Sequence, residues 1–123
     1  MRLTKDFNRS EFDCNDGSVM PKEVLLNIQK LANQLQVLRD FLGVTITVNS
    51  AYRSPSYNKK IGGVSNSQHI LGKAADITAE GYTPAQVYAR IEKLIKSGDM
   101  LQGGLGSYST FTHYDIRKTR ARW

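Results

Sequence analysis

The chain has 123 residues, of which 40% are apolar and 23% charged, and this balance predicts one folded domain that spans residues 1–123. No apolar run approaches the roughly 20 residues of a membrane-spanning helix, and the N-terminus lacks the apolar core of a signal peptide, so we expect a chain made in the cytoplasm without membrane contact. We also expect a monomer. The net charge of +6 suits an anionic partner, but the basic residues are scattered except near the end of the chain, so nucleic acid is supported by charge alone and is not expected.

The first third of the chain is predicted to be scaffold. Apolar residues among polar neighbours at positions 3–12 indicate a packing arm, and the polar run at 15–18 predicts a turn. Cys14 is the single cysteine, which excludes an internal disulfide and leaves a small apolar residue near that turn as its expected role. A long helix then begins at Pro21 and ends before Gly43, because apolar residues recur at intervals of three and four between them.

The middle of the chain alternates short elements with loops. Residues 44–49 are rich in β-branched side chains and predict a strand, which is followed by a short helix over residues 55–60. A loop then leads to a second strand that carries Asp76. Thr83, with proline next and glutamine three positions on, predicts a capped helix that runs to residue 96.

Two strands are predicted at the end of the chain. Residues 102–108 are rich in glycine but lack the pattern of a phosphate-binding loop, so we expect a strand that another segment approaches closely. In the strand over residues 111–117, alternation places His113, Asp115 and Arg117 on one face. The order of elements predicts an α+β domain with a small, mainly antiparallel sheet backed by helices. Trp123 is expected to be a terminal packing anchor.

The two histidines of the chain lie in the segments 67–76 and 112–115. His69, Asp76 and His113 could supply the two imidazoles and one carboxylate of a catalytic zinc site with one open position. The spacing of His69 and Asp76, seven residues with Gly72 between them, excludes a single helix face and favours a loop that leads into a strand. Two histidines could equally be ordinary surface residues or hydrogen-bonded core residues.

The pattern Ser67-x-His69-x-x-Gly72-x-Ala74-x-Asp76, followed by a late His113, resembles the metal motif of the zinc D-Ala-D-Ala carboxypeptidase family. That family includes vancomycin-resistance dipeptidases, phage endolysins and, at the level of fold, the Hedgehog signalling domain. The segment 49–58, with Arg53, resembles the arginine segment of the same family, so the similarity extends over most of the chain.

The resemblance implies a Hedgehog-like and D-Ala-D-Ala peptidase-like fold, with Zn²⁺ held by His69, Asp76 and His113. It implies hydrolysis of peptide bonds in peptidoglycan by a phage-type lysis enzyme that acts on the bacterial cell wall, whose anionic polymers suit the basic chain. It also implies that Arg53 engages a carbonyl or carboxylate of the substrate, although a surface salt bridge is the plainer role. Ser67 and Gln68 would bind substrate or merely hold the loop.

The chain departs from the family at Thr110, where better-known members carry an acid three positions before the last histidine ligand. Asp115 is the nearest replacement for a general base, and a partner that orients His113 or pairs with Arg117 is an equal alternative. The missing acid also leaves open a zinc-bearing module that binds cell wall without hydrolysing it.

Overall fold

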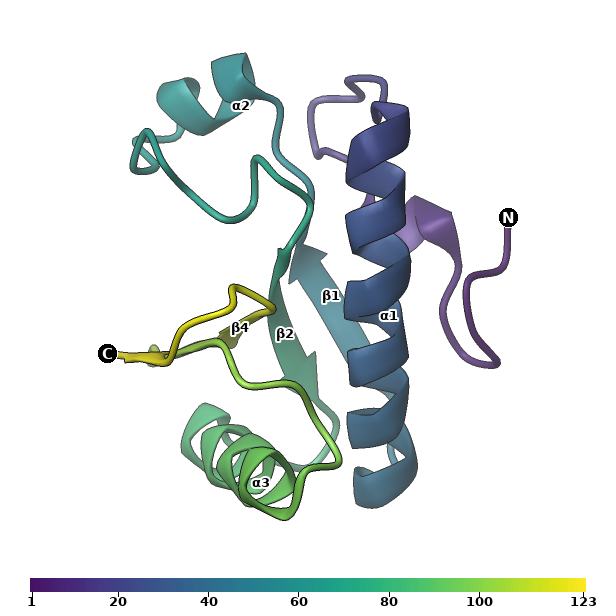
Figure 1. Cartoon of the computed structure of the whole chain (residues 1–123), viewed down its shortest axis with the longest axis vertical. Coiled ribbons are helices and arrows are strands. Elements are labelled where there is room, and N and C mark those ends of the chain that lie inside the picture. The colour runs from purple at the N-terminus through teal and green to yellow at the C-terminus, as the bar shows by residue number, and fades with distance from the viewer.

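The computed structural model describes residues 1–123, which form one mixed layer of strands with helices packed around it (Figure 1). The elements are η1 (Arg9–Phe12, a 3-10 helix), α1 (Lys22–Leu42), β1 (Ile46–Ser50), α2 (Pro55–Lys60), β2 (Ala74–Ala79), α3 (Pro84–Ser97), β3 (Gly104–Ser107), β4 (Thr112–Asp115) and β5 (Ala121–Arg122). The sheet order is β1-β2-β4-β3-β5, and every neighbouring pair is antiparallel except β3 and β5. The predicted α+β class with a mainly antiparallel sheet is therefore confirmed.

Helix α1 supplies more buried apolar residues than any other element of the fold. It follows Pro21 directly and ends where Gly43 adopts the left-handed conformation, with a φ of 69°. Its buried residues follow the spacing seen in the sequence: Val24, Ile28, Leu31, Ala32, Leu35, Leu38 and Leu42. Figure 1 shows α1 lying along one side of the sheet, so this stripe and the sheet together form the main core.

The two faces of the sheet have different characters. Ala75 and Ile77 of β2 and Tyr114 of β4 belong to the apolar core. Asp76 and His113 alternate with these residues along the two strands. Their side chains therefore point to the opposite face, where they are buried but polar. Asp76 and His113 are direct partners in the β2–β4 register, which puts their side chains side by side.

Both remaining helices begin with the caps that their sequences predict. The hydroxyl of Ser54 accepts a hydrogen bond from the amide of Tyr57 at the start of α2. Thr83 and Gln86 form a capping box at the start of α3, which ends where Gly98 has a φ of 85°. In Figure 1, α2 and α3 lie at opposite ends of the other side of the sheet, with the C-terminal segment between them. None of the helices has the length and hydropathy needed to cross a lipid bilayer.

Candidate metal centre

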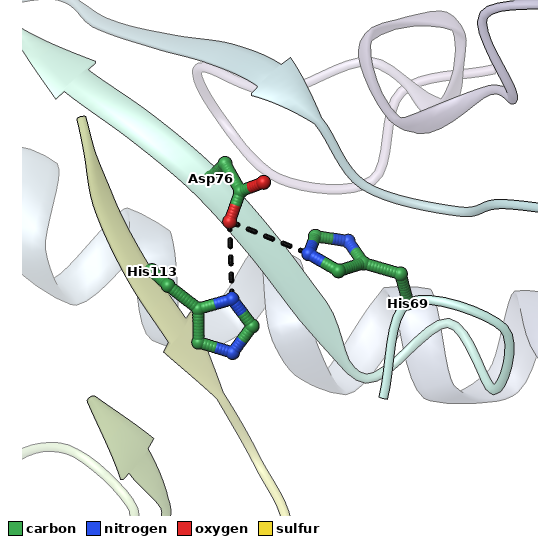
Figure 2. Close-up of side chains that lie close together, drawn as sticks. All are labelled: His69, Asp76 and His113. Atoms are coloured by element: carbon green, nitrogen blue, oxygen red, sulfur yellow. Dashed lines mark hydrogen bonds and ion pairs between the residues drawn. The ribbon is translucent and has the colours of Figure 1, made fainter. Parts of the chain in front are cut away.

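Three buried side chains from separate segments converge on the polar face of the sheet. His69 comes from the loop before β2, Asp76 from β2 and His113 from β4, and Figure 2 shows both imidazoles turned toward the carboxylate. Oδ1 of Asp76 lies 3.3 Å from Nε2 of His69 and 3.0 Å from Nδ1 of His113. One potential ligand atom from each residue lies within 4.8 Å of the other two, so a single ion could contact all three.

The backbone explains why these residues meet. Asp76 and His113 are fixed by the antiparallel pairing of β2 and β4, which is set by the apolar residues on the opposite face. His69 reaches them because the chain turns sharply at Gly72, which has a φ of 74°. A side chain at Gly72 would also meet Val24, since a Cβ there would lie 2.6 Å from Cγ1 of that residue. The motif glycine is therefore needed both for the turn and for close packing on α1.

Each histidine is oriented by a second partner on its far nitrogen. Nδ1 of His69 lies 2.7 Å from the carbonyl oxygen of Ala51, which can only accept, so Nδ1 carries the hydrogen and Nε2 is left free to bind an ion. Nε2 of His113 lies 2.8 Å from Oδ2 of Asp115, which leaves Nδ1 of His113 toward Asp76. Histidine ligands of metals commonly have such partners, because the hydrogen bond fixes both the tautomer and the ring orientation.

Arg53 contacts the outer oxygen of the third candidate ligand. Its Nη2 lies 3.3 Å from Oδ2 of Asp76, while Nε donates to Ser50 and Nη1 to Asn58. The main chain of the same residue donates to the carbonyl of His69. Arg53 also lines the cleft at the site, so the plain alternative of a surface salt bridge does not describe its position.

The electrostatics of the centre favour charge on both carboxylates. Burial alone would raise the pKa of Asp76, but the adjacent imidazoles of His113 and His69 outweigh burial and hold this pKa well below its usual range. For His113, burial would lower the pKa of the imidazole, and the hydrogen bonds to Asp115 and Asp76 raise it above its ordinary value instead. The centre thus presents an anionic oxygen between two ring nitrogens, and a cation that binds here would displace any proton shared between them, because metal ligands must be deprotonated.

Asp115 lies behind His113 rather than facing the cleft. Its Oδ2 accepts hydrogen bonds from His113 and from Nη2 of Arg117, both at 2.8 Å. Its Oδ1 accepts from the amide of Gly104 at 2.9 Å and from Nε of Arg117 at 2.9 Å. The residue is 0% exposed, and hydrogen bonds from His113 and Arg117 lower its pKa against the opposing effect of burial. This position matches the alternative of an orienting partner and gives no support to the expectation that Asp115 lies near the open position as a general base.

Ser67 and Gln68 have different positions in the loop that carries His69. The hydroxyl of Ser67 is buried and accepts a hydrogen bond from the amide of His69, a contact that holds the loop. The carbonyl of Gln68 accepts from the amides of Leu71 and Lys73, while the residue itself borders the cleft. Both residues line the cleft, but Ser67 is only 8% exposed, so Ser67 fits the role of tying down the loop and Gln68 is the more accessible of the two to a substrate.

A cleft of about 480 Å³ opens beside the three convergent residues. One side is formed by the loop that follows α2, including Ile61 and Val64. The other side is formed by Tyr108, Phe111 and Trp123. Trp123, predicted to be a terminal packing anchor, therefore also borders the cleft. Phe111 and Trp123 were missed as cleft residues. Alternation in the predicted strand places Phe111 on the face of His113 but does not show which side chains border a cleft, and no periodicity of the sequence relates Trp123 to His113.

The donor set fits zinc on its own chemistry. Two imidazole nitrogens and one carboxylate oxygen form the ligand set of many catalytic zinc sites, which keep a fourth position for water. The cleft borders His69, Asp76 and His113, so a fourth position would be reachable from solvent. Each candidate ligand also contacts a second residue that orients it: His69 contacts Ala51, Asp76 contacts Arg53, and His113 contacts Asp115.

The sequence of the chain is similar to sequences of known peptidases. A sequence model described as Peptidase M15 matches residues 2–115. A zinc D-Ala-D-Ala carboxypeptidase from Streptomyces albus G is 37% identical over 75 residues, which cover 60% of this chain and 29% of that protein. The chain therefore spans less than a third of the length of the curated relative that it matches.

Proposed function

Because the chain belongs to the peptidase M15 family, we propose that it is a zinc peptidase. Its proposed substrates are peptide bonds in bacterial peptidoglycan, either in stem peptides or in cross-links. The observation that carries the proposal is the convergence of His69, Asp76 and His113 within 4.8 Å beside an open cleft. We propose residues 1–123 as a single peptidase domain that acts as a monomer.

The zinc would be held by Nε2 of His69, a carboxylate oxygen of Asp76 and Nδ1 of His113. Zinc bound in this way supplies an acidified water as nucleophile and polarises the carbonyl that is attacked. The residues of the chain contribute orientation: the carbonyl of Ala51 and the carboxylate of Asp115 fix the two imidazoles, and Arg53 fixes Asp76. A ligand set that is ordered before the ion binds loses little conformational freedom on binding.

Arg53 is the proposed anchor for the substrate. A guanidinium has five N–H donors, and three are used on Ser50, Asn58 and Asp76. Two donors therefore remain, on a side chain that lines the cleft beside the metal ligands. A carbonyl or carboxylate oxygen of a peptide would satisfy them, because arginine stays charged at every relevant pH.

The peptidase differs from a second candidate function in its need for a general base, a group that accepts a proton from the attacking water. Among the residues that line the cleft, Asp76 is the one acid, and Thr110 is exposed outside it. Because Asp76 is a candidate metal ligand and its Oδ2 is paired with Arg53, no cleft residue offers a carboxylate that is free to act as a general base. This absence of a free carboxylate favours, as the second candidate, a zinc-bearing module that binds the cell wall without hydrolysis.

We also propose that the wall itself is the site of action and that the enzyme is of the phage lysis type. The net charge of +6 supports this, because a basic protein is drawn to the anionic polymers of a bacterial wall. The name of the Streptomyces relative supports a D-alanyl-D-alanine bond as the first substrate to test.

The test uses the zinc-loaded full chain with intact cell walls and with acylated peptides that end in D-alanyl-D-alanine. A peptidase of the carboxypeptidase type releases free D-alanine, whereas an endopeptidase exposes new amines in the wall and clears its turbidity. Either product should vanish on chelation and return with zinc. Wall binding without any released amine would instead establish the binding module and refute the peptidase.

A further inference from the structure

One wall of the cleft is made of aromatic side chains that contact one another. The rings of Tyr108 and Phe111 are stacked, with centroids 4.4 Å apart and planes at 14°. The ring centroids of Trp123 and His113 are 5.0 Å apart, so this wall extends to the proposed metal centre. Tyr108 and Trp123 are 42% and 45% exposed, so both side chains are accessible from the cleft.

The position of Trp123 is fixed by its surroundings. Its amide donates to the carbonyl of Leu105 and its carbonyl accepts from the amide of Ser107, so its backbone is attached to β3. The guanidinium of Arg117 lies 5.3 Å from the ring centroid. Beneath the ring is Gly106, where a Cβ would lie 2.6 Å from the indole nitrogen. The glycine of β3 thus makes room for an indole at the cleft.

The hydrogen bond between the two exposed rings has a defined direction. Nε1 of Trp123 lies 2.8 Å from the hydroxyl oxygen of Tyr108. An indole N–H can only donate, so the tyrosine oxygen is the acceptor. The hydroxyl hydrogen of Tyr108 is then free to donate, and that oxygen makes no other hydrogen bond within the protein. A neutral donor is thereby oriented on the wall of the cleft, on a ring that Phe111 holds by stacking.

We propose that Tyr108 is a substrate-binding residue that donates its hydroxyl hydrogen to a carbonyl or carboxylate oxygen of the peptide, and that Trp123 is a positioning residue that acts through Tyr108. This inference rests on the proposed peptidase function. A peptide in the cleft offers acceptor oxygens at every residue. Arg53 and Tyr108 both line the cleft, so Tyr108 would supply a donor in addition to that of Arg53.

Four variants of the zinc-loaded protein test the assignment: Tyr108→Phe, Trp123→Phe, the double variant and Tyr88→Phe. Tyr108→Phe keeps the ring and its stacking, Trp123→Phe removes the N–H donor, and Tyr88→Phe on α3 is a matched control away from the cleft. Calorimetric affinity for the peptide and separate values of kcat and KM are measured for each. Peptides with a free and an amidated C-terminus show which oxygen is contacted.

Tyr108→Phe should lower kcat/KM and affinity about tenfold, as expected for one lost hydrogen bond, and Trp123→Phe should lower them about threefold. The double variant should match Tyr108→Phe, because Trp123 acts through the hydroxyl. A loss with both peptides assigns the contact to a carbonyl, and a loss with the free acid alone assigns it to the carboxylate.

A Tyr108→Phe protein that behaves like Tyr88→Phe, in a background where the wild type turns over peptide, would overturn the inference and leave the proposed function intact. Additive losses in the double variant would overturn the positioning role of Trp123. A wild type that neither binds nor cleaves any peptide would refute the proposed function, and the inference with it. Because Trp123 is the single tryptophan of the chain, its fluorescence gives an independent measure of cleft occupancy in Tyr108→Phe.

Discussion

The two faces of strands β2 and β4 are built from neighbouring residues but have opposite environments. On one face, Ile77 and Tyr114 are fully buried against apolar side chains of the core. On the other face, Asp76 and His113 are buried among hydrogen-bonding partners at the edge of a cleft. The apolar face is stabilised by the removal of surface from water, whereas the polar face would cost stability if its groups were not paired.

This difference shows how the geometry of the centre is maintained. A shift of β4 by one residue would move Tyr114 onto the polar face and His113 into the core, so the apolar face strongly disfavours any other register. The polar face therefore obtains the alignment of Asp76 and His113 from contacts on the other side of the sheet. Loss of a residue on the polar face should affect function, and loss of a residue on the apolar face should affect stability.

The largest effect is expected from His69→Ala on the polar face. A metal contributes several kcal/mol of transition-state stabilisation, so loss of a ligand should lower peptide hydrolysis by about a thousandfold or more. The zinc content after dialysis should fall in parallel, while the circular dichroism spectrum stays that of the wild type. In the wild type, chelation should lower the melting temperature, because zinc binds the folded state alone. A variant that keeps its zinc and its activity would remove His69 from the site.

The next effect is expected on the apolar face, from Leu35→Ala in α1. Leu35 is 0% exposed, and removal of its side chain leaves a cavity that should cost about 3 kcal/mol of unfolding free energy. Leu26→Ala on the same helix is the matched control, since Leu26 is 69% exposed and its loss should change stability by less than about 0.5 kcal/mol. Urea titration measures both, and activity per folded molecule should be unchanged. A drop in zinc affinity in Leu35→Ala would show that the two faces are not separable.

A smaller effect is expected from Asp115→Asn, which also separates the two roles considered for this residue. An orienting partner of a metal ligand typically contributes 10- to 100-fold to metal affinity, so zinc should bind about that much more weakly. Turnover should recover when zinc is added in excess. A variant that keeps full zinc occupancy but has no turnover would establish Asp115 as the general base and refute the orienting role.

The smallest effect concerns the N-terminal arm, which contacts the arginine segment beside the polar face. Hydrogen bonds from Cys14 and Ser18 hold the pKa of Asp16 at about 2, and its carboxylate accepts from the cap residue Ser54. Because this pKa is lower in the folded state than the usual unfolded value near 3.9, Asp16 stabilises the fold above about pH 4, and the contribution is lost as the pH falls toward 2. Urea midpoints for wild type and Asp16→Asn should therefore differ at pH 6 and converge on acidification. A difference that does not change with pH would contradict this account.

The scaffold could be predicted closely because its signals are local. The spacing of apolar residues gave the long helix to within one residue at its start, and the caps at Ser54 and Thr83 follow from side chains that bond their own backbone. Strand limits were less accurate. The strand predicted over residues 44–49 is Ile46–Ser50, and the one predicted over residues 111–117 ends at Asp115. Strand pairing decides these ends, and pairing depends on residues far apart in the sequence.

The depth of a side chain could not be predicted from alternation. The pattern placed Asp115 on the same face as His113, and the structure places it there. Gly104 and Arg117 nevertheless enclose its carboxylate, and this enclosure depends on the packing of β3 against β4. The aromatic wall was missed for a similar reason, since Trp123 reaches the cleft through the parallel pairing of β5 with β3. Glycines at alternate positions of β3 were the one available signal, because they predicted a close approach without naming what approaches.

The pairing of Asp76 with His113 also constrains the order in which the protein can fold. The two residues are 37 positions apart, so the chain must close a long loop, at an entropic cost, before their side chains can meet. A zinc ion cannot act as a nucleus for that closure, because two of its ligands are far apart until the sheet has formed. We therefore expect the sheet to form on its apolar core before the ion binds, which makes the ion a late addition to the native state. Zinc is therefore expected to slow unfolding while leaving the rate of folding almost unchanged.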